Sequence, residues 1–206
     1  MTDNDLTQIA KQLFYIHTKL KNYDKGFINV VENMFADIIK NQEADGCISN
    51  TVFLYICAKY YKLNVRLCYG IVDVEGLEFY HMWLELDDII IDLSIYGNVN
   101  FPHPLFQDTI KSHNIQMYYP NIGTYKEVKG TYYRFRKDYD YSMSNMSMVE
   151  GSSIHKYMSF MNTIHDDRLW YKCCMYLGIR TNIQDMVAYL KELTIDDYIT
   201  ETMRRL

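Results

Sequence analysis

Hydrophobic positions near the start of the chain repeat with the spacing of an α-helix in two successive stretches. In residues 3–20 they fall on one stripe, and in residues 27–38 the same three- and four-residue spacing returns. The polar segment 41–46 interrupts this pattern and ends in Gly46, a residue that suits a turn or a close backbone approach. We therefore expect two amphipathic helices followed by a break.

The next stretch is apolar almost all round. From Cys47 to about Tyr61 the spacing is helical, and residues 52–58 form an unbroken hydrophobic run. A helix without a polar face is stable only when other elements cover it on several sides. We expect this helix to be buried at the centre of the fold.

From Val65 onward the period of the pattern changes to two. Hydrophobic and polar residues alternate in 65–71, and Glu75-Gly76 makes a plausible turn into a second strand at 78–86. Asp87-Asp88 then interrupts the pattern before a third strand at 89–94. A helix followed by an antiparallel three-stranded meander predicts an α+β fold.

The second predicted hairpin decides which polar side chains share a face. A turn centred on Asp87-Asp88 places Trp83 opposite Asp92. His81 and Asp92 then become diagonal neighbours on one face, about 7–8 Å apart, a gap that their side chains can bridge. A slip of one residue would move one of them to the opposite face. A first turn at Glu75-Gly76 also places Gly70 opposite His81, which leaves space beside the imidazole.

The pattern weakens beyond residue 97. Residues 98–107 read as a loop with two prolines, and His103 and His113 are expected at the surface. Further predicted segments are edge strands at 117–119 and 131–136, an exposed Met/Tyr-rich loop at 139–153, and helices near 153–165, 167–177 and 182–193. With no separating linker, we expect a single domain over 1–206, with a core at about 24–135 and a helical C-terminal extension at about 152–206.

Composition narrows the classes of function. The 206 residues are 49% hydrophobic, and a formal charge of -5 without a basic run makes nucleic acid an unexpected partner. The acidic N-terminus is unlike a signal peptide, and no apolar run could span a membrane, so we expect a cytoplasmic protein, with export by another route left open. Five cysteines without CxxC spacing argue against a disulfide framework and a zinc site, and no cofactor is expected.

Three residues in this framework could act together as a thiol site. Cys47 would begin the buried helix, where the helix N-terminus and a neighbouring imidazolium both favour a thiolate. His81 would carry the proton to a leaving group, and Asp92 would hold the ring in one tautomer. The backbone N–H of Cys47 could hold the developing oxyanion, with Gln42 as a candidate second donor.

Each of these residues alone has an ordinary structural interpretation. A cysteine at a buried helix start usually packs, a strand histidine usually hydrogen-bonds, and an aspartate at a strand end usually belongs to a turn. The combination of a cysteine at a helix start with a histidine and an aspartate on one sheet face favours an enzyme that transfers an acyl group from an amide of a protein or peptide. The alternative is a non-catalytic module that uses the same fold to bind a protein or peptide.

Short motifs at these positions resemble the transglutaminase-like superfamily. They are Gly46-Cys47, Leu67-Cys68-Tyr69-Gly70, His81-Met82-Trp83, which is similar to the family's His-Ala-Trp, and Ile91-Asp92-Leu93-Ser94, which is similar to its Asp-Pro-Thr. The resemblance covers about residues 41–97. Met82 replaces the family's small residue, Leu93 stands where proline is common, and the interval from His81 to Asp92 is short.

The resemblance implies a papain-like fold and a thiol mechanism. The core would be a buried Cys-bearing helix packed on an antiparallel sheet, with N-terminal and C-terminal helices added. Members of the superfamily include transglutaminases, protein deamidases, peptide N-glycanases and arylamine N-acetyltransferases. The expected site is then Cys47, His81 and Asp92, shaped by Gly46, Gly70 and Trp83, and the oligomeric state stays open.

Overall fold

The computed structural model describes residues 3–44, 46–134 and Met175. The chain divides into two units, residues 1–134 and 135–206, and the fold described below is that of the first. The predicted loop at 139–153 and the helices predicted in 153–193 lie outside the described residues. The predicted C-terminal extension therefore stays a prediction.

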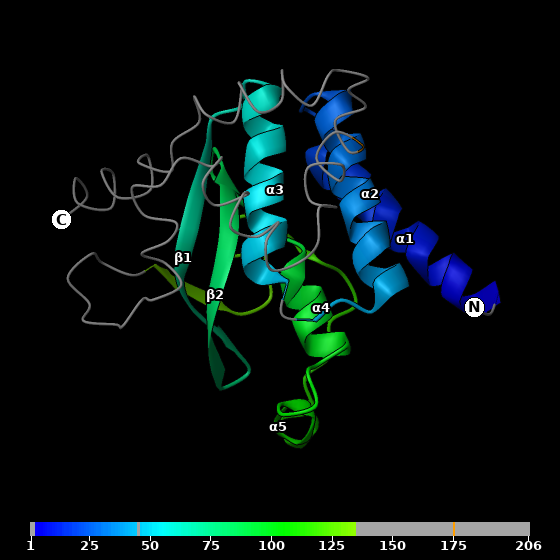
Figure 1. Ribbon diagram of the computed structural model, residues 1–206, viewed down its shortest axis with the longest axis vertical. Helices are drawn as coiled ribbons and strands as arrows, with labels where there is room; N and C mark the ends of the chain where they lie inside the picture. The colour runs from blue at the N-terminus through cyan, green and yellow to red at the C-terminus, as the bar shows by residue number, and fades with distance from the viewer. Residues whose placement is uncertain (1–2, 45, 135–174, 176–206) are drawn as a thin grey trace. The chain divides into compact units, whose positions relative to one another are not determined.

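Three helices form the N-terminal part of the fold. They are α1 (Asp3–Leu20), α2 (Lys25–Asn41) and α3 (Cys47–Tyr60), as the spacing of hydrophobic residues predicts. Asp24 caps α2 by accepting hydrogen bonds from the backbone N–H groups of Gly26 and Phe27. The helix α3 is buried along most of its length, and Figure 1 shows it beside β1 and β2, with α2 and α1 beyond it. The predicted central helix is confirmed.

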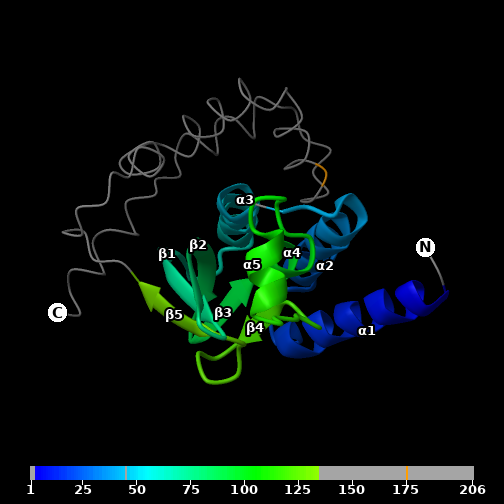
Figure 2. The same ribbon diagram turned by 90° about the horizontal axis from the view of Figure 1, so that it is seen from below.

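A five-stranded antiparallel sheet faces these helices. Its strands are β1 (Val65–Val74), β2 (Leu77–Leu86), β3 (Ile89–Asp92), β4 (Asn121–Gly123) and β5 (Thr131–Arg134), arranged in the order β4-β3-β2-β1-β5. Figure 2 shows β5 lying beside β1 at one edge of the sheet. The predicted α+β class and the antiparallel meander β1-β2-β3 are confirmed.

Both hairpins have the predicted register. Gly70 pairs with His81 across the first hairpin, and Leu84 pairs with Ile91 across the second. The turn residues Glu75 and Gly76 have positive φ angles of 54° and 86°, a conformation that keeps a two-residue hairpin turn tight. The alternation of side chains in β2 and β3 is therefore the one that puts His81 and Asp92 on the same face.

Both faces of the sheet are covered. On the face that carries His81, buried residues of β1, β2 and β3 form one cluster with residues of α4 (Ser94–Asn100), α5 (Gln107–Ser112) and the segment after α5. The strands contribute Cys68, Val72, Trp83 and Ile90, and the later segments contribute Ile95, Val99, Ile110 and Met117. The alternate residues of β1 and β2 are buried on the other face, beside α3. No helix of the described part is long and apolar enough to cross a membrane.

The third strand is shorter than predicted because Asp92 starts a new element. The backbone N–H of Ile95 donates to Oδ1 of Asp92 at 3.1 Å, which turns the chain into α4 instead of continuing the strand. Residues 94–100, predicted as strand end and loop, are therefore helical. The short helix α5 also forms at the end of the stretch that was expected to be a loop.

The edge strand predicted at residues 117–119 is wrong. The carbonyl oxygens of Met117 and Tyr118 accept hydrogen bonds from the side chains of Asn100 and Gln12, so side chains satisfy groups that a neighbouring strand would otherwise use. The strand forms two residues later as β4, which pairs with β3. The strand predicted from Thr131 is confirmed as β5, through Arg134.

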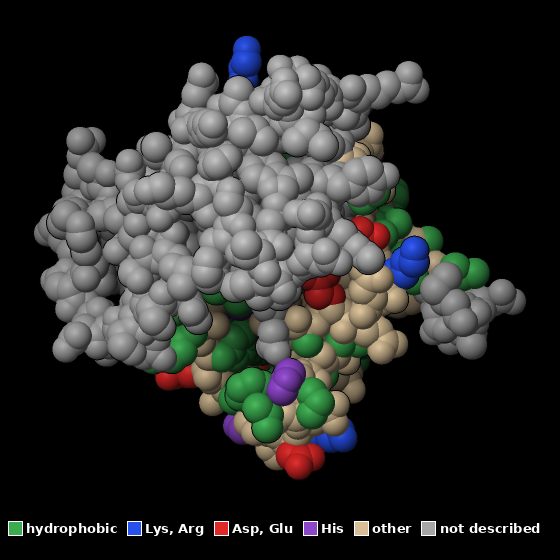
Figure 3. Space-filling view, in the orientation of Figure 1, with side chains coloured by type: hydrophobic (Ala, Val, Ile, Leu, Met, Phe, Trp, Pro, Cys, Tyr) green, Lys and Arg blue, Asp and Glu red, His purple; other side chains and the backbone are tan. Residues whose placement is uncertain are grey.

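The region around α5 is exposed. Leu105 is 80% exposed and Phe106 is 56% exposed, and Figure 3 shows hydrophobic side chains beside a histidine at the end of the molecule where α5 lies. His103 and His113 are both exposed, as predicted. Neither histidine belongs to the site described next.

Candidate active site

A buried histidine and a buried carboxylate form the centre of the candidate site. Nε2 of His81, on β2, lies 2.8 Å from Oδ2 of Asp92 at the end of β3, and both side chains are inaccessible to solvent. The ring of Phe79 packs edge-on against the imidazole, with 5.6 Å between ring centroids. The hairpin register alone brings the two polar groups together, because they are diagonal neighbours on one sheet face.

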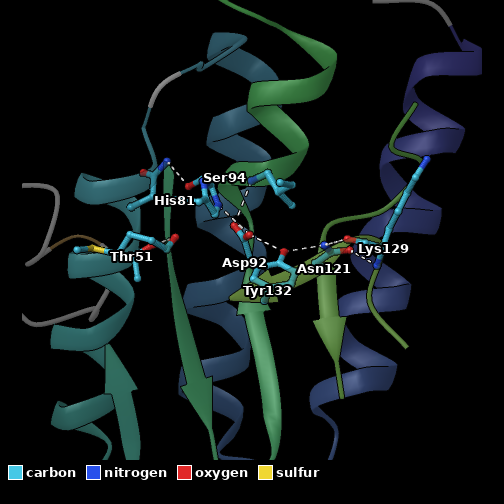
Figure 4. Close-up of polar contacts among 10 residues, drawn as sticks. Thr51, His81, Asp92, Ser94, Asn121, Lys129 and Tyr132 are labelled. Carbon is cyan, nitrogen blue, oxygen red and sulfur yellow. Dashed lines mark hydrogen bonds and ion pairs between the residues drawn. The ribbon is translucent and has the colours of Figure 1, made fainter. Parts of the chain in front are cut away.

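The carboxylate of Asp92 has further partners beyond His81. The hydroxyl of Tyr132, on β5, donates to the same oxygen Oδ2 at 2.7 Å. The side-chain amide of Asn121, on β4, contacts that hydroxyl at 2.7 Å and also bonds the backbone of Lys129. Figure 4 shows this chain of contacts running from His81 through Asp92 and Tyr132 to Asn121 and Lys129.

Two side chains of α3 hold the start of this helix beside the histidine. The hydroxyl of Thr51 donates to the backbone carbonyl of Met82, the residue after His81, at 3.0 Å. One turn along α3 from Cys47, the side-chain amide of Asn50 donates to the hydroxyl of Ser94 at 3.4 Å. These bonds tie the first turn of α3 to β2 and to the start of α4, which places Cys47 at the same end of the sheet as His81.

The thiol of Cys47 is half-buried and interacts with the imidazole. Burial lowers the pKa of His81, but the charge and hydrogen bond of Asp92, followed by the interaction with Cys47, raise it to about 10. The other ring nitrogen, Nδ1, is buried and lacks a well-formed hydrogen bond within the described residues. Of the two ring nitrogens, Nε2 is engaged by Asp92, which leaves Nδ1 as the one without a hydrogen-bond partner among the described residues.

The backbone around Cys47 is closely packed. Gly46 is the N-cap of α3, and a Cβ there would lie 2.6 Å from Nδ2 of Asn50 and 2.7 Å from the carboxylate of Glu43. A Cβ on Gly97, in α4, would lie 2.2 Å from the backbone oxygen of Glu43. Two glycines thus allow the segment before Cys47 to pass between α3 and α4. Within the described residues no side chain caps the N-terminus of α3, so the first N–H groups of this helix lack a side-chain acceptor there.

The other residues predicted for the site, Gly70, Trp83 and Gln42, lie at different distances from His81 along the fold. Gly70 lies directly opposite His81 in the sheet. Trp83 is fully buried two residues along β2, and its ring packs against Tyr132 at 5.0 Å between centroids. Gln42 ends α2 in a left-handed conformation, φ 49°, with its side chain exposed. His81 therefore contacts both Asp92 and Cys47, whereas Gln42 is an exposed residue at the end of α2.

Three residues of the site were not predicted from the sequence: Tyr132, Asn121 and Gly97. Tyr132 was placed in a possible edge strand, but the pairing of β5 with β1 is a contact between distant segments. No local signal marks Asn121 or Gly97. Within the described ranges, no cluster of three His, Cys, Asp or Glu side chains could hold a metal ion.

Comparisons with known proteins returned nothing for this chain. No protein-family model, no curated protein and no solved structure matches it.

Proposed function

We propose that this protein is a thiol-dependent acyl-transfer enzyme of the transglutaminase-like type, acting on an amide bond of a protein or peptide. The observation that carries the proposal is the buried pair of His81 and Asp92, whose imidazole interacts with the thiol of Cys47 at the start of α3 and has its second nitrogen, Nδ1, without a hydrogen-bond partner among the described residues. A thiol, an imidazole and an orienting carboxylate are the groups that nucleophilic catalysis by cysteine requires.

The pKa of His81 supports this reading of the site. Although burial lowers it, Asp92 and Cys47 together raise it to about 10, so the ring is an imidazolium near neutral pH. An imidazolium beside a thiol stabilises the thiolate, which is the nucleophilic form. Because Asp92 engages Nε2, the proton that is available to the thiol and to a leaving group is the one on Nδ1.

The reaction would proceed through a thioester. The thiolate of Cys47 adds to the amide carbonyl carbon, and the oxyanion is held by the N–H groups at the start of α3. The C–N bond then breaks as the amine nitrogen takes the proton from Nδ1 of His81. A water molecule or a second amine attacks the thioester, gives its proton back to Nδ1 and releases the thiolate. Water gives hydrolysis or deamidation, and an amine gives transamidation.

Selective alkylation tests the proposal without a known substrate. Iodoacetamide at pH 6 is expected to label Cys47 fastest among the five cysteines, and His81→Gln should slow this labelling about 10–100-fold because the thiolate loses its counter-ion. Cys57, on the same helix, is an internal control, because burial raises the pKa of its thiol. A His113→Gln variant, changed at an exposed histidine, controls for the loss of an imidazole elsewhere.

Equal labelling of all five cysteines, or slowest labelling at Cys47, would contradict the enzyme proposal. That result would instead favour a module that binds a protein or peptide without chemistry. Cys47→Ala would then leave binding of such a partner unchanged.

A further inference from the structure

The hydrogen bonds behind Asp92 have only one consistent set of directions. The backbone N–H of Lys129 donates to Oδ1 of Asn121 at 3.0 Å, which identifies that atom as the amide oxygen. Nδ2 of Asn121 is then the donor to the carbonyl oxygen of Lys129 and to the hydroxyl oxygen of Tyr132, both at 2.7 Å. The backbone of the segment between β4 and β5 therefore sets the orientation of the amide.

This orientation decides where the proton of Tyr132 points. Its oxygen already accepts from Asn121, and the neighbouring carboxylate of Asp92 can only accept, so the hydroxyl donates to Oδ2 of Asp92. The same oxygen accepts from Nε2 of His81, while Oδ1 accepts from the backbone N–H of Ile95. Tyr132 and His81 therefore share one acceptor atom.

We propose that Tyr132 is a positioning residue that acts through Asp92: its hydroxyl keeps the His81 proton at Nε2 and limits how tightly Asp92 holds the ring. Two donors to one oxygen share its negative charge, so each bond is weaker than it would be alone. The orientation of the carboxylate does not depend on Tyr132, because Ile95 holds the other oxygen. Loss of the hydroxyl should therefore strengthen the bond between His81 and Asp92.

The effect of Tyr132 on His81 matters for proton transfer in the proposed reaction, and this part of the inference rests on the proposed function. A general acid works best when its pKa lies near the working pH, and a ring that holds its proton too tightly gives it up slowly. The groups that shift the titration of His81 are Asp92 and Cys47, and those that act on Tyr132 are Asp92, Asn121 and Tyr125. Tyr132 thus reaches His81 only by way of Asp92.

The experiment is an NMR titration of His81 in the full chain carrying Cys47→Ala. The thiol is one of the two groups that raise the pKa of His81, so Cys47→Ala should move the titration of His81 to lower pH. Adding Tyr132→Phe should raise the pKa of His81 by about half a unit to one unit, the size of part of one charge-assisted hydrogen bond. Phenylalanine keeps the ring that packs on Trp83. His81→Gln identifies the resonance.

Two controls isolate the role of the hydroxyl. Tyr133→Phe changes the neighbouring, exposed tyrosine of β5 and should leave the titration of His81 unmoved. In a chain that also carries Asp92→Asn, Tyr132→Phe should cause no additional shift, because its route to the ring is gone. Asn121→Ala, which removes the donor to the hydroxyl oxygen, should shift the titration in the same direction as Tyr132→Phe but by less.

The inference is overturned if the pKa of His81 stays the same or falls in Tyr132→Phe. A fall would mean that the substitution loosens the site and admits water, and that the hydroxyl does not weaken the bond between His81 and Asp92. An equal shift in the Asp92→Asn chain would overturn the route through Asp92. If Tyr132→Phe does not fold, the titration of His81 in Asn121→Ala takes its place: a raised pKa supports the inference, and an unchanged or lowered pKa overturns it. Because these chains lack the thiol, the outcome is separate from the alkylation test of the proposed function.

Discussion

The two halves of the candidate site are built in opposite ways. The half on the sheet, His81 with Asp92, is fully buried and linked by hydrogen bonds to Tyr132 and Asn121. The half on α3, with Cys47 at its start, is half-buried and follows a segment whose Gln42 is exposed. The two halves therefore differ in burial and in access to solvent. In the proposed reaction, proton transfer uses the buried, hydrogen-bonded pair, whereas the thiol has to be reached by the substrate.

The same contrast appears in what holds each half in place. Strand pairing and buried hydrogen bonds fix the sheet-borne half, and β2, β3, β4 and β5 each contribute one polar side chain to it. Close backbone packing at Gly46 and Gly97 fixes the segment before Cys47. A substitution in the first half should therefore change protonation, and one in the second should change the position of the thiol.

The largest expected effect comes from removing the charge of the buried half. In Asp92→Asn, burial is left as the main influence on His81, so its pKa should fall from about 10 to below the ordinary 6.5. The ring is then neutral near pH 7, and alkylation of Cys47 at pH 6 should slow about 10–100-fold. NMR titration of His81 and the alkylation rate measure the two effects. An unchanged titration would show that Asp92 does not control the ring.

The buried pair should also make folding stability depend on pH. The pKa of His81 is raised on folding, so its stabilising contribution is complete below about pH 6.5 and is lost as the pH rises through about 10. Urea unfolding of the wild-type chain from pH 6 to pH 10 should show a decline of a few kcal/mol, since each pKa unit is worth about 1.4 kcal/mol.

The quantity to compare between variants is the change in the free energy of unfolding with pH, because the absolute stability also changes with the substitution. His81→Gln removes the positive charge beside the buried carboxylate of Asp92 and lowers stability, but the part of the pH-dependent decline due to His81 should vanish. His103→Gln, at an exposed histidine, should retain the wild-type slope. Equal slopes in the wild-type chain and in His81→Gln would contradict a raised pKa at His81.

The smallest expected effect concerns the half on α3. Gly97→Ala places a methyl group 2.2 Å from the backbone oxygen of Glu43, so the segment before Cys47 must shift. We expect a loss of about 1–3 kcal/mol in stability and slower alkylation of Cys47, while the titration of His81 changes little. Gly76→Ala is the matched control, because it strains a turn with φ 86° but has no neighbour within 4 Å. A changed titration of His81 in Gly97→Ala would show that the two halves are not separate.

Much of the site could be predicted because hairpins are local. Asp87-Asp88 and Glu75-Gly76 lie at the tips of hairpins whose registers follow from the turn positions, and these registers put Gly70 and Asp92 beside His81. The helix starting at Cys47 follows from its uninterrupted apolar run. Such signals lie within about 15 residues of the groups they position.

The errors arose where local and distant contacts compete. Residues 117–119 are predicted to form an edge strand, yet the side chains of Asn100 and Gln12 donate to the carbonyl groups of Met117 and Tyr118. Ser94 continues an apolar stretch, yet the bond from Ile95 to Asp92 begins a helix there. In each case a hydrogen bond between a side chain and the backbone fixes a conformation other than the strand that the pattern predicts.

The sequence by itself determined the helix that bears Cys47 and the hairpin face that His81 and Asp92 share, because turn positions and side-chain alternation are properties of neighbouring residues. Only the tertiary structure decided that β5 pairs with β1 and that β4 pairs with β3, which brings Tyr132 and Asn121 beside Asp92. It also decided that Gly97 supports the segment before Cys47. These contacts join segments far apart in the chain, and they form only when the packing of the whole unit brings those segments together.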